Sequence, residues 1–139
     1  MPASVEVDPP DQVHGGERIL LVEDDGAVRD FLRAVLEDHG YRVMEAINGP
    51  DALDIARKQP HEIHLLITDV VMPGMNGKQL AERLHQERPQ LKIIFLSGYL
   101  TDVIGHRGVL ERDVAFLQKP VSPEVFAAKV HDVLNGTSV

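Results

Sequence analysis

Short apolar runs recur along the chain, separated by segments in which apolar residues follow a helical spacing. Residues 18–23 form a nearly continuous apolar run, which is typical of a strand buried on both faces of a sheet. Similar runs lie at 64–69, 91–96 and 114–118. The run at 41–46 is more polar and suits a strand at the edge of the sheet. The pattern therefore predicts five strands.

Five segments between or after these runs have the apolar spacing of helices. They are residues 28–36, 48–58, 76–87, 99–112 and 122–134. In the last segment Phe126, Val130 and Val133 form one apolar stripe. The segment 99–112 is the weakest of the five, because Gly105 and Gly108 each cost roughly 1 kcal/mol relative to alanine in a helix interior.

Residues suited to helix ends stand where these helices should begin or stop. Asp25 is expected to cap or begin the first helix, and Asn48 can cap the second. Asn76, with Gln79 three residues later, resembles a capping box for the third helix. Gly40 lies just past the first helix, where a glycine commonly ends it. These residues fix the expected boundaries.

Strands that alternate with helices predict an α/β fold. The expected architecture is an open, doubly wound parallel sheet of five strands with five helices on its two faces. Right-handed crossovers leave few topologies for such a chain. Ligand sites in these sheets lie at the carboxyl ends of the strands, where the strand order reverses. The residues that end each strand are therefore the ones to inspect.

The chain has 139 residues and is expected to form one folded domain. Residues 1–16 are acidic and rich in proline and glycine, which predicts a flexible tail or linker. The domain is expected to span residues 17–135, and 136–139 form a short C-terminal tail.

Composition excludes several classes of protein. The formal net charge of -8 argues against a nucleic-acid-binding surface, which needs clustered lysine and arginine. There is no cysteine, so thiolate metal sites and cysteine nucleophiles are excluded. No apolar run approaches the roughly 20 residues that a membrane helix needs, and no signal peptide is visible. We expect a protein of the cytoplasm.

Three acids and a lysine stand at the ends of predicted strands. Glu23 and Asp24 close the first strand, Asp69 closes the third, and Lys119 closes the fifth. In a parallel sheet all four converge on one edge. Carboxylates gathered there repel one another unless a divalent cation lies between them. The neighbouring lysine suggests that an anion, such as a phosphoryl group, also binds.

Four motifs in this order resemble the receiver domain of two-component response regulators. They are Glu23-Asp24, Asp69-Val-Val-Met-Pro-Gly74, Ser97-Gly-Tyr99 and Lys119-Pro120. The resemblance covers about residues 17–135. It implies a flavodoxin-like fold with strand order 2-1-3-4-5.

The resemblance also implies the ligands of a metal ion. Asp24 and Asp69 would bind Mg²⁺ or Mn²⁺ directly. Glu23 would act mainly through a metal-bound water, and the backbone carbonyl of Val71 would supply a further ligand. Mg²⁺ prefers oxygen ligands and keeps several waters, which agrees with this set.

The same resemblance assigns the phosphoryl chemistry. Asp69 would accept a phosphoryl group from a phosphohistidine, and an aspartate is expected to be ionised already near neutral pH. The Ser97 hydroxyl would contact the phosphoryl oxygens, and Lys119 would pair with them. Ser97 and Phe116 would switch a face built from the fourth helix, fifth strand and fifth helix. Phe116 is equally well explained as a buried strand aromatic. The domain would assist its own phosphorylation and dephosphorylation.

The implied partner is a histidine kinase or a histidine phosphotransfer protein, within a phosphorelay. The switching face is where a homodimer would form. The strings 96–99, 108–110 and 116–120 look like receivers of hybrid histidine kinases, in which case the parent protein would be a kinase. A stand-alone regulator is the alternative, and a degenerate receiver that only docks is another.

Two other folds with related chemistry fit less well. A phosphohydrolase of the haloacid-dehalogenase type needs an Asp-x-Asp pair after its first strand, which is missing here. A flavodoxin cradles the flavin phosphate in a loop after strand one, whereas the corresponding loop here begins Glu23-Asp24-Asp25 and would repel a phosphate.

Overall fold

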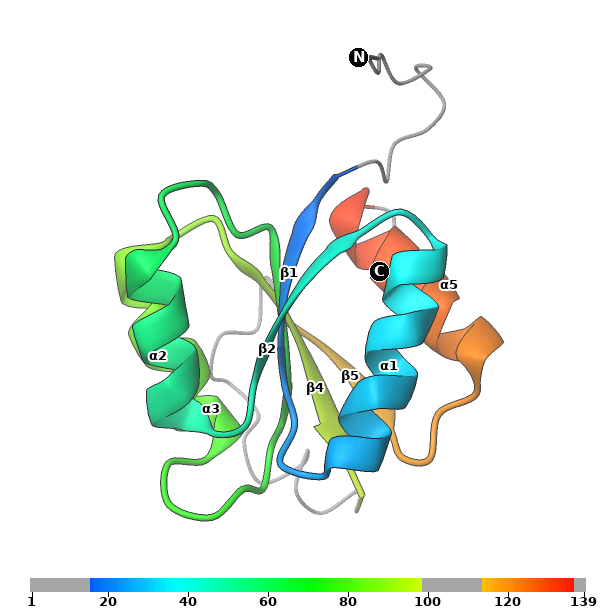
Figure 1. Ribbon diagram of the computed structural model, residues 1–139, viewed down its shortest axis with the longest axis horizontal. Coiled ribbons are helices and arrows are strands. Elements are labelled where there is room, and N and C mark those ends of the chain that lie inside the picture. Colours follow the sequence, from blue (N-terminus) through cyan, green and yellow to red (C-terminus); the bar gives the residue numbers. More distant parts are fainter. Residues whose placement is uncertain (1–15, 99–113, 137–139) are drawn as a thin grey trace.

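A parallel five-stranded sheet forms the centre of the protein (Figure 1). The structure is a computed structural model, and it describes residues 16–98 and 114–136. The strands are β1 Arg18–Val22, β2 Arg42–Ala46, β3 Leu65–Asp69, β4 Lys92–Ser97 and β5 Val114–Gln118. Their order is β2-β1-β3-β4-β5, and all neighbours are parallel. The expected flavodoxin-like topology is confirmed.

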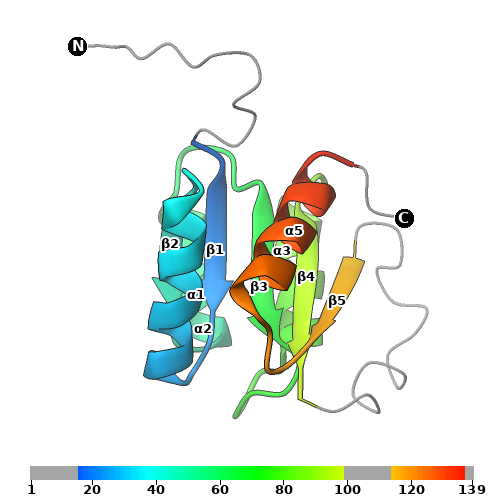
Figure 2. The same ribbon diagram turned by 90° about the vertical axis from the view of Figure 1, so that its right-hand side faces the viewer.

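The described residues contain four of the five expected helices. These are α1 Gly26–Asp38, α2 Gly49–Lys58, α3 Gly77–Glu87 and α5 Pro123–Leu134. Helices α1 and α5 cover one face of the sheet, and α2 and α3 cover the other (Figures 1 and 2). The helix expected in 99–112 lies outside the described residues, as do most of the two predicted tails.

Burial follows the pattern of the apolar runs. Every residue of β3 is buried, and so are all residues of β1 except Arg18. In β2 only Ala46 is buried, which agrees with its place at the sheet edge. The sheet separates two apolar clusters, one beneath α1 and α5 and one beneath α2 and α3. No helix in the described ranges is long and apolar enough to cross a membrane.

The helix ends confirm the predicted caps. The Asp25 carboxylate accepts hydrogen bonds from two amides in the first turn of α1, and Asn48 caps α2. Asn76 and Gln79 form a reciprocal capping box at the start of α3. Gly40 has a φ of +90°, the left-handed conformation that favours glycine after a helix. Local sequence therefore sets where each helix begins and where α1 ends.

The first residue of α3 lies directly against the end of β3. The Gly77 amide donates a 2.8 Å hydrogen bond to the Val70 carbonyl. A Cβ atom at Gly77 would collide with the backbone carbonyl of Asp69. Only glycine permits this close approach, so the position of Asp69 depends on it.

We predict that Gly77→Ala lowers the free energy of unfolding by about 1–3 kcal/mol, because the added methyl group overpacks the junction of β3 and α3. Urea unfolding followed by circular dichroism measures the loss. Gly26→Ala is the matched control, since its new Cβ would only reach ordinary contact with the Arg29 side chain at 3.7 Å. Equal stability of the two variants would contradict the prediction.

Candidate functional site

Three carboxylates meet at the carboxyl edge of the sheet. Glu23 and Asp24 directly follow β1, and Asp69 is the last residue of β3. One oxygen from each lies within 4.8 Å of the others. Glu23 and Asp69 are buried, whereas Asp24 is exposed to solvent. The sequence-based expectation that these acids converge is confirmed in the geometry.

The ammonium group of Lys119 contacts two of the carboxylates. It follows β5, and its Nζ lies 2.8 Å from Asp69 Oδ1 and 3.0 Å from Glu23 Oε1. Both oxygens are inaccessible to solvent. One partly exposed cation therefore faces two buried carboxylates, with the exposed Asp24 beside them, so carboxylates outnumber the ammonium group in the pocket.

This environment changes the protonation of Asp69. Burial, followed by the neighbouring Glu23, raises the pKa of the Asp69 carboxyl to about 7, although Lys119 opposes the shift. Burial lowers the pKa of Lys119, but Asp69 and Glu23 outweigh it and leave that pKa above its usual value. The expectation that Asp69 is already ionised near neutral pH is therefore met only in part, because a pKa of about 7 leaves part of this carboxyl protonated there. The cause is desolvation, which the sequence does not display.

The backbone around Glu23 holds its carboxylate in place. The Glu23 amide donates a 3.1 Å hydrogen bond to the Ala46 carbonyl of β2. The Asp25 amide donates to Glu23 Oε2 at 3.1 Å. Asp25 itself caps α1, as expected, and does not belong to the carboxylate cluster.

Sequence reasoning missed one residue of this neighbourhood. The guanidinium of Arg29, on α1, donates a 2.8 Å hydrogen bond to the backbone carbonyl of Glu23. It also pairs with Glu45 of β2. A pair separated by 16 positions leaves no local signal in the sequence, and the packing of α1 against β2 brings it together.

The remaining predicted residues lie at the same edge or just behind it. Ser97 ends β4 and is buried, and its carbonyl accepts a 2.7 Å hydrogen bond from the Lys119 amide. The Val71 side chain is exposed. Phe116, in β5, is half-buried and packs against Phe95, with ring centroids 5.5 Å apart. The peptide bond between Lys119 and its following proline is cis.

An apolar groove borders Lys119 on the α1 side of the sheet. Its walls come from Val28 and Phe31 of α1 and from Pro120 and Val121, which follow β5. Phe31 is 42% exposed, although it is a large apolar side chain. The groove therefore offers apolar surface to a partner directly beside the ion pairs of Lys119.

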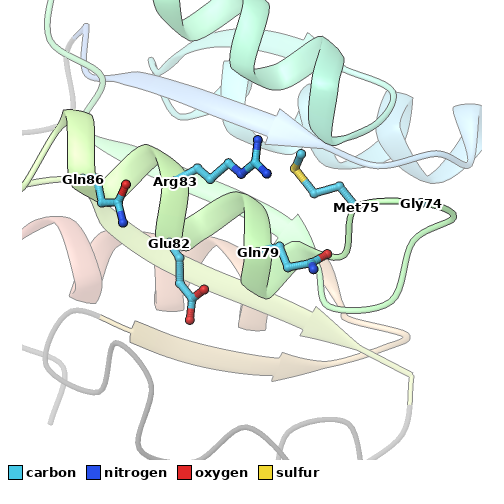
Figure 3. A pocket seen from close by; sticks show the side chains of 6 residues that line it. All are labelled: Gly74, Met75, Gln79, Glu82, Arg83 and Gln86. Atoms are coloured by element: carbon cyan, nitrogen blue, oxygen red, sulfur yellow. The ribbon is translucent and has the colours of Figure 1, made fainter.

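A second, polar hollow lies over α3 and the loop before it (Figure 3). Gln79, Glu82, Arg83 and Gln86 line it from the helix, and Met75 lies at its rim. Its lining includes neither the acids nor Lys119. It is therefore separate from the carboxylate pocket.

The raised pKa of Asp69 predicts how stability depends on pH in the absence of metal. A carboxyl that is protonated more readily when folded stabilises the protein below its ordinary pKa of 3.8, and loses this contribution as pH rises to about 7. Asp69→Asn does not titrate. Relative to the wild type, its free energy of unfolding should increase between pH 4 and 7 and then level off. Urea unfolding in a chelator tests this, and a difference independent of pH would contradict it.

Comparison with known proteins gives a consistent family. The response regulator receiver domain family matches residues 19–131. The chain is 38% identical to the sensor kinase CckA of Brucella abortus over 86% of this chain, but it spans only 13% of that protein. It is 40% identical to the response regulator receiver protein CpdR of Brucella abortus, covering 75% of this chain and 85% of CpdR.

Solved structures agree with the sequence comparison. The receiver domain of the hybrid histidine kinase CckA superposes with a TM-score of 0.73 at 38% identity, over 84% of this chain and 98% of that one. A CheY-like receiver from Methanospirillum hungatei gives a TM-score of 0.75 at 31% identity, over 87% and 95% of the two chains. Together with the match over residues 19–131, these likenesses establish that the chain belongs to the response regulator receiver domain family of two-component signalling.

Proposed function

We propose that this domain accepts a phosphoryl group on Asp69 in a reaction that depends on Mg²⁺ or Mn²⁺. The observation that carries the proposal is the contact of the Lys119 ammonium with both Asp69 and Glu23 in a pocket that also contains Asp24. The pocket combines a carboxylate acceptor with a cation able to pair with an incoming phosphoryl group. Phosphoryl transfer needs mainly positioning and charge neutralisation, and this arrangement supplies both.

The carboxylate cluster fits a hard divalent cation. Asp24 and Asp69 would bind it directly, Glu23 through a water, and the Val71 carbonyl would add another oxygen. Two buried carboxylate oxygens have no hydrogen-bond donor among the described residues apart from the Lys119 ammonium, which supports a further cation. When bound, Mg²⁺ supplies charge neutralisation and favours the ionised form of Asp69, whose pKa is otherwise about 7.

In the proposed transfer, Asp69, Lys119 and Ser97 each have a separate role. A carboxylate oxygen of Asp69 attacks the phosphorus atom. The phosphorus–nitrogen bond of the donor breaks, and its electron pair returns to the donor imidazole. Lys119 transfers its ion pair from the carboxylates to the phosphoryl oxygens, and the Ser97 hydroxyl donates to one of them. The product is an acyl phosphate on Asp69.

The donor is a histidine kinase or a histidine phosphotransfer protein. The apolar groove beside Lys119 supports this, because it lets a partner bury Phe31 and Val121 while its phosphohistidine reaches Asp69. Exposed apolar surface next to a polar reaction centre is typical of an interaction site. Nucleic acid and membrane are not part of the proposal.

Phosphorylation is proposed to switch the face that contains β5 and α5. Ser97 would move toward the phosphoryl group, and Phe116 would change its rotamer. Phe116 is half-buried, which supports a side chain that could turn between an inward and an outward position. The same face is the proposed site of a homodimer, and the segment 99–112 that would complete it lies outside the described residues.

The proposed setting is a phosphorelay in the cytoplasm, with this domain as the receiver of a hybrid histidine kinase. The likeness to the CckA receiver supports that setting. The likeness to CpdR, most of whose length the chain covers, supports the alternative of a stand-alone regulator. The reading frame around this sequence in its genome decides between them.

Asp69 is expected to be the residue that becomes phosphorylated. Incubation with acetyl phosphate and Mg²⁺ should add one phosphoryl group, seen in the intact-protein mass, and Asp69→Asn should abolish the addition. Asp54→Asn is the matched control, because Asp54 is an exposed aspartate of α2 that pairs only with Lys58 among the described residues. Absence of any addition to the wild type would favour a degenerate receiver that only docks.

The apolar groove beside Lys119 is expected to matter for transfer from a protein donor. Phe31→Ser removes exposed apolar surface from α1 without touching the acids, so it should slow transfer from a phosphorylated histidine phosphotransfer domain at least several-fold. Rapid-quench kinetics with radiolabelled phosphate measures the rate. The same variant should accept phosphate from acetyl phosphate at the wild-type rate. Equal rates from the protein donor would remove the groove from the proposal.

A further inference from the structure

The loop that carries Glu23 and Asp24 is held by a side chain from α1. Arg29 Nη1 donates a 2.8 Å hydrogen bond to the backbone carbonyl of Glu23. The guanidinium folds back over the first turn of the helix, and a Cβ on Gly26 would lie 3.7 Å from its Nη2. The hydrogen bond therefore joins the helix to the peptide group between the two acids.

Arg29 is itself fixed by a second strand. Its Nε lies 3.2 Å from Glu45 Oε1, and the other oxygen of Glu45 lies 2.8 Å from Arg33 Nη1. The Arg29 side chain is only 19% exposed. A guanidinium has a rigid planar fork of donors, so two fixed acceptors leave it little freedom. Glu45 therefore sets the direction from which Arg29 reaches the loop.

The carbonyl that Arg29 binds belongs to the peptide group that leads into Asp24. The orientation of that group determines where the Asp24 side chain leaves the backbone, because the peptide is planar. Glu23 has its own carboxylate contacts, from Lys119 and the Asp25 amide. Asp24 is exposed, and within residues 16–98 and 114–136 its carboxylate makes no hydrogen bond or ion pair. Its aim therefore depends on the backbone that Arg29 holds.

We propose that Arg29 is a positioning residue for the divalent-cation site, and that Glu45 acts on the site through Arg29. The pair keeps the peptide between Glu23 and Asp24 in the orientation that brings the Asp24 carboxylate to Asp69. Arg33 shares the Glu45 carboxylate, but among the described residues it makes no hydrogen bond to the loop, and Arg29 keeps its own bond to the other Glu45 oxygen without it. The inference rests on the proposed function, because it assumes that the carboxylate cluster binds a cation.

The experiment measures Mg²⁺ affinity by isothermal titration calorimetry on the unphosphorylated protein, without any phosphodonor. Removing residues that orient metal ligands typically weakens binding roughly 10- to 100-fold. Because Asp24 is one ligand of several, we expect Arg29→Ala to weaken Mg²⁺ binding by about 10-fold, and Glu45→Gln by a smaller factor. Arg29→Lys should recover part of the loss, because its ammonium can still donate to the carbonyl.

Arg33→Ala is the matched control. It also removes an arginine of α1 from Glu45, so any general weakening of the helix or of β2 should appear in it as well. Its Mg²⁺ affinity should equal that of the wild type. The double variant Arg29→Ala, Glu45→Gln should bind Mg²⁺ no more weakly than Arg29→Ala alone, since Glu45 acts only through Arg29.

Unfolding midpoints measured in parallel separate positioning from folding. If Arg29→Ala lowers the midpoint but leaves Mg²⁺ affinity unchanged, Arg29 is merely structural and the inference is wrong. If Arg33→Ala weakens Mg²⁺ binding as much as Arg29→Ala, the effect is not specific to the loop, and the inference is again wrong. If the wild type binds no Mg²⁺ while acetyl phosphate still modifies Asp69, the inference falls and the acceptor role stands. If neither occurs, the proposed function itself has failed.

Discussion

The whole protein is organised around the mutual repulsion of carboxylates that are held together at one edge of the sheet. Glu23 and Asp69 are withdrawn from water within contact distance of one ammonium group, with Asp24 beside them. Burial penalises the charged form of a carboxyl, and a second carboxylate nearby adds to the penalty. As a result, the pKa of the Asp69 carboxyl rises to about 7, so it keeps a proton more readily than an ordinary aspartate does. A divalent cation bound among these carboxylates would lower their mutual repulsion.

Several parts of the fold hold these carboxylates close together. The parallel sheet brings the carboxyl ends of β1, β3, β4 and β5 to one edge, and its two apolar clusters fix their relative positions (Figure 2). Gly77 lets the start of α3 lie directly against the Asp69 carbonyl, which holds the end of β3 in place. Arg29 and Glu45 tie the loop after β1 to β2 from the opposite side. These backbone and side-chain contacts keep the acids close together despite their mutual repulsion.

The features that the sequence predicted are those with local causes. The caps at Asp25, Asn48 and Asn76 depend on neighbours within a few residues, so their signals survive in one sequence. Two less local features were also predicted: the strand order was implied by the family resemblance, and the meeting of Glu23, Asp24, Asp69 and Lys119 followed from placing them at the ends of parallel strands. The Arg29–Glu45 pair was missed because its partners meet only when α1 packs against β2. The pKa of Asp69 was misjudged because burial depends on every element around it.

The hydrogen bond between the Ser97 carbonyl and the Lys119 amide has a mechanical consequence. At 2.7 Å it couples the end of β4 to the start of the connection after β5. The Ser97 hydroxyl and the Lys119 ammonium, which would both contact a phosphoryl group, are thus carried on backbones that are hydrogen-bonded to each other. A displacement of one backbone would therefore shift the other as well. The two contacts to the phosphoryl group, from Ser97 and from Lys119, would then form together.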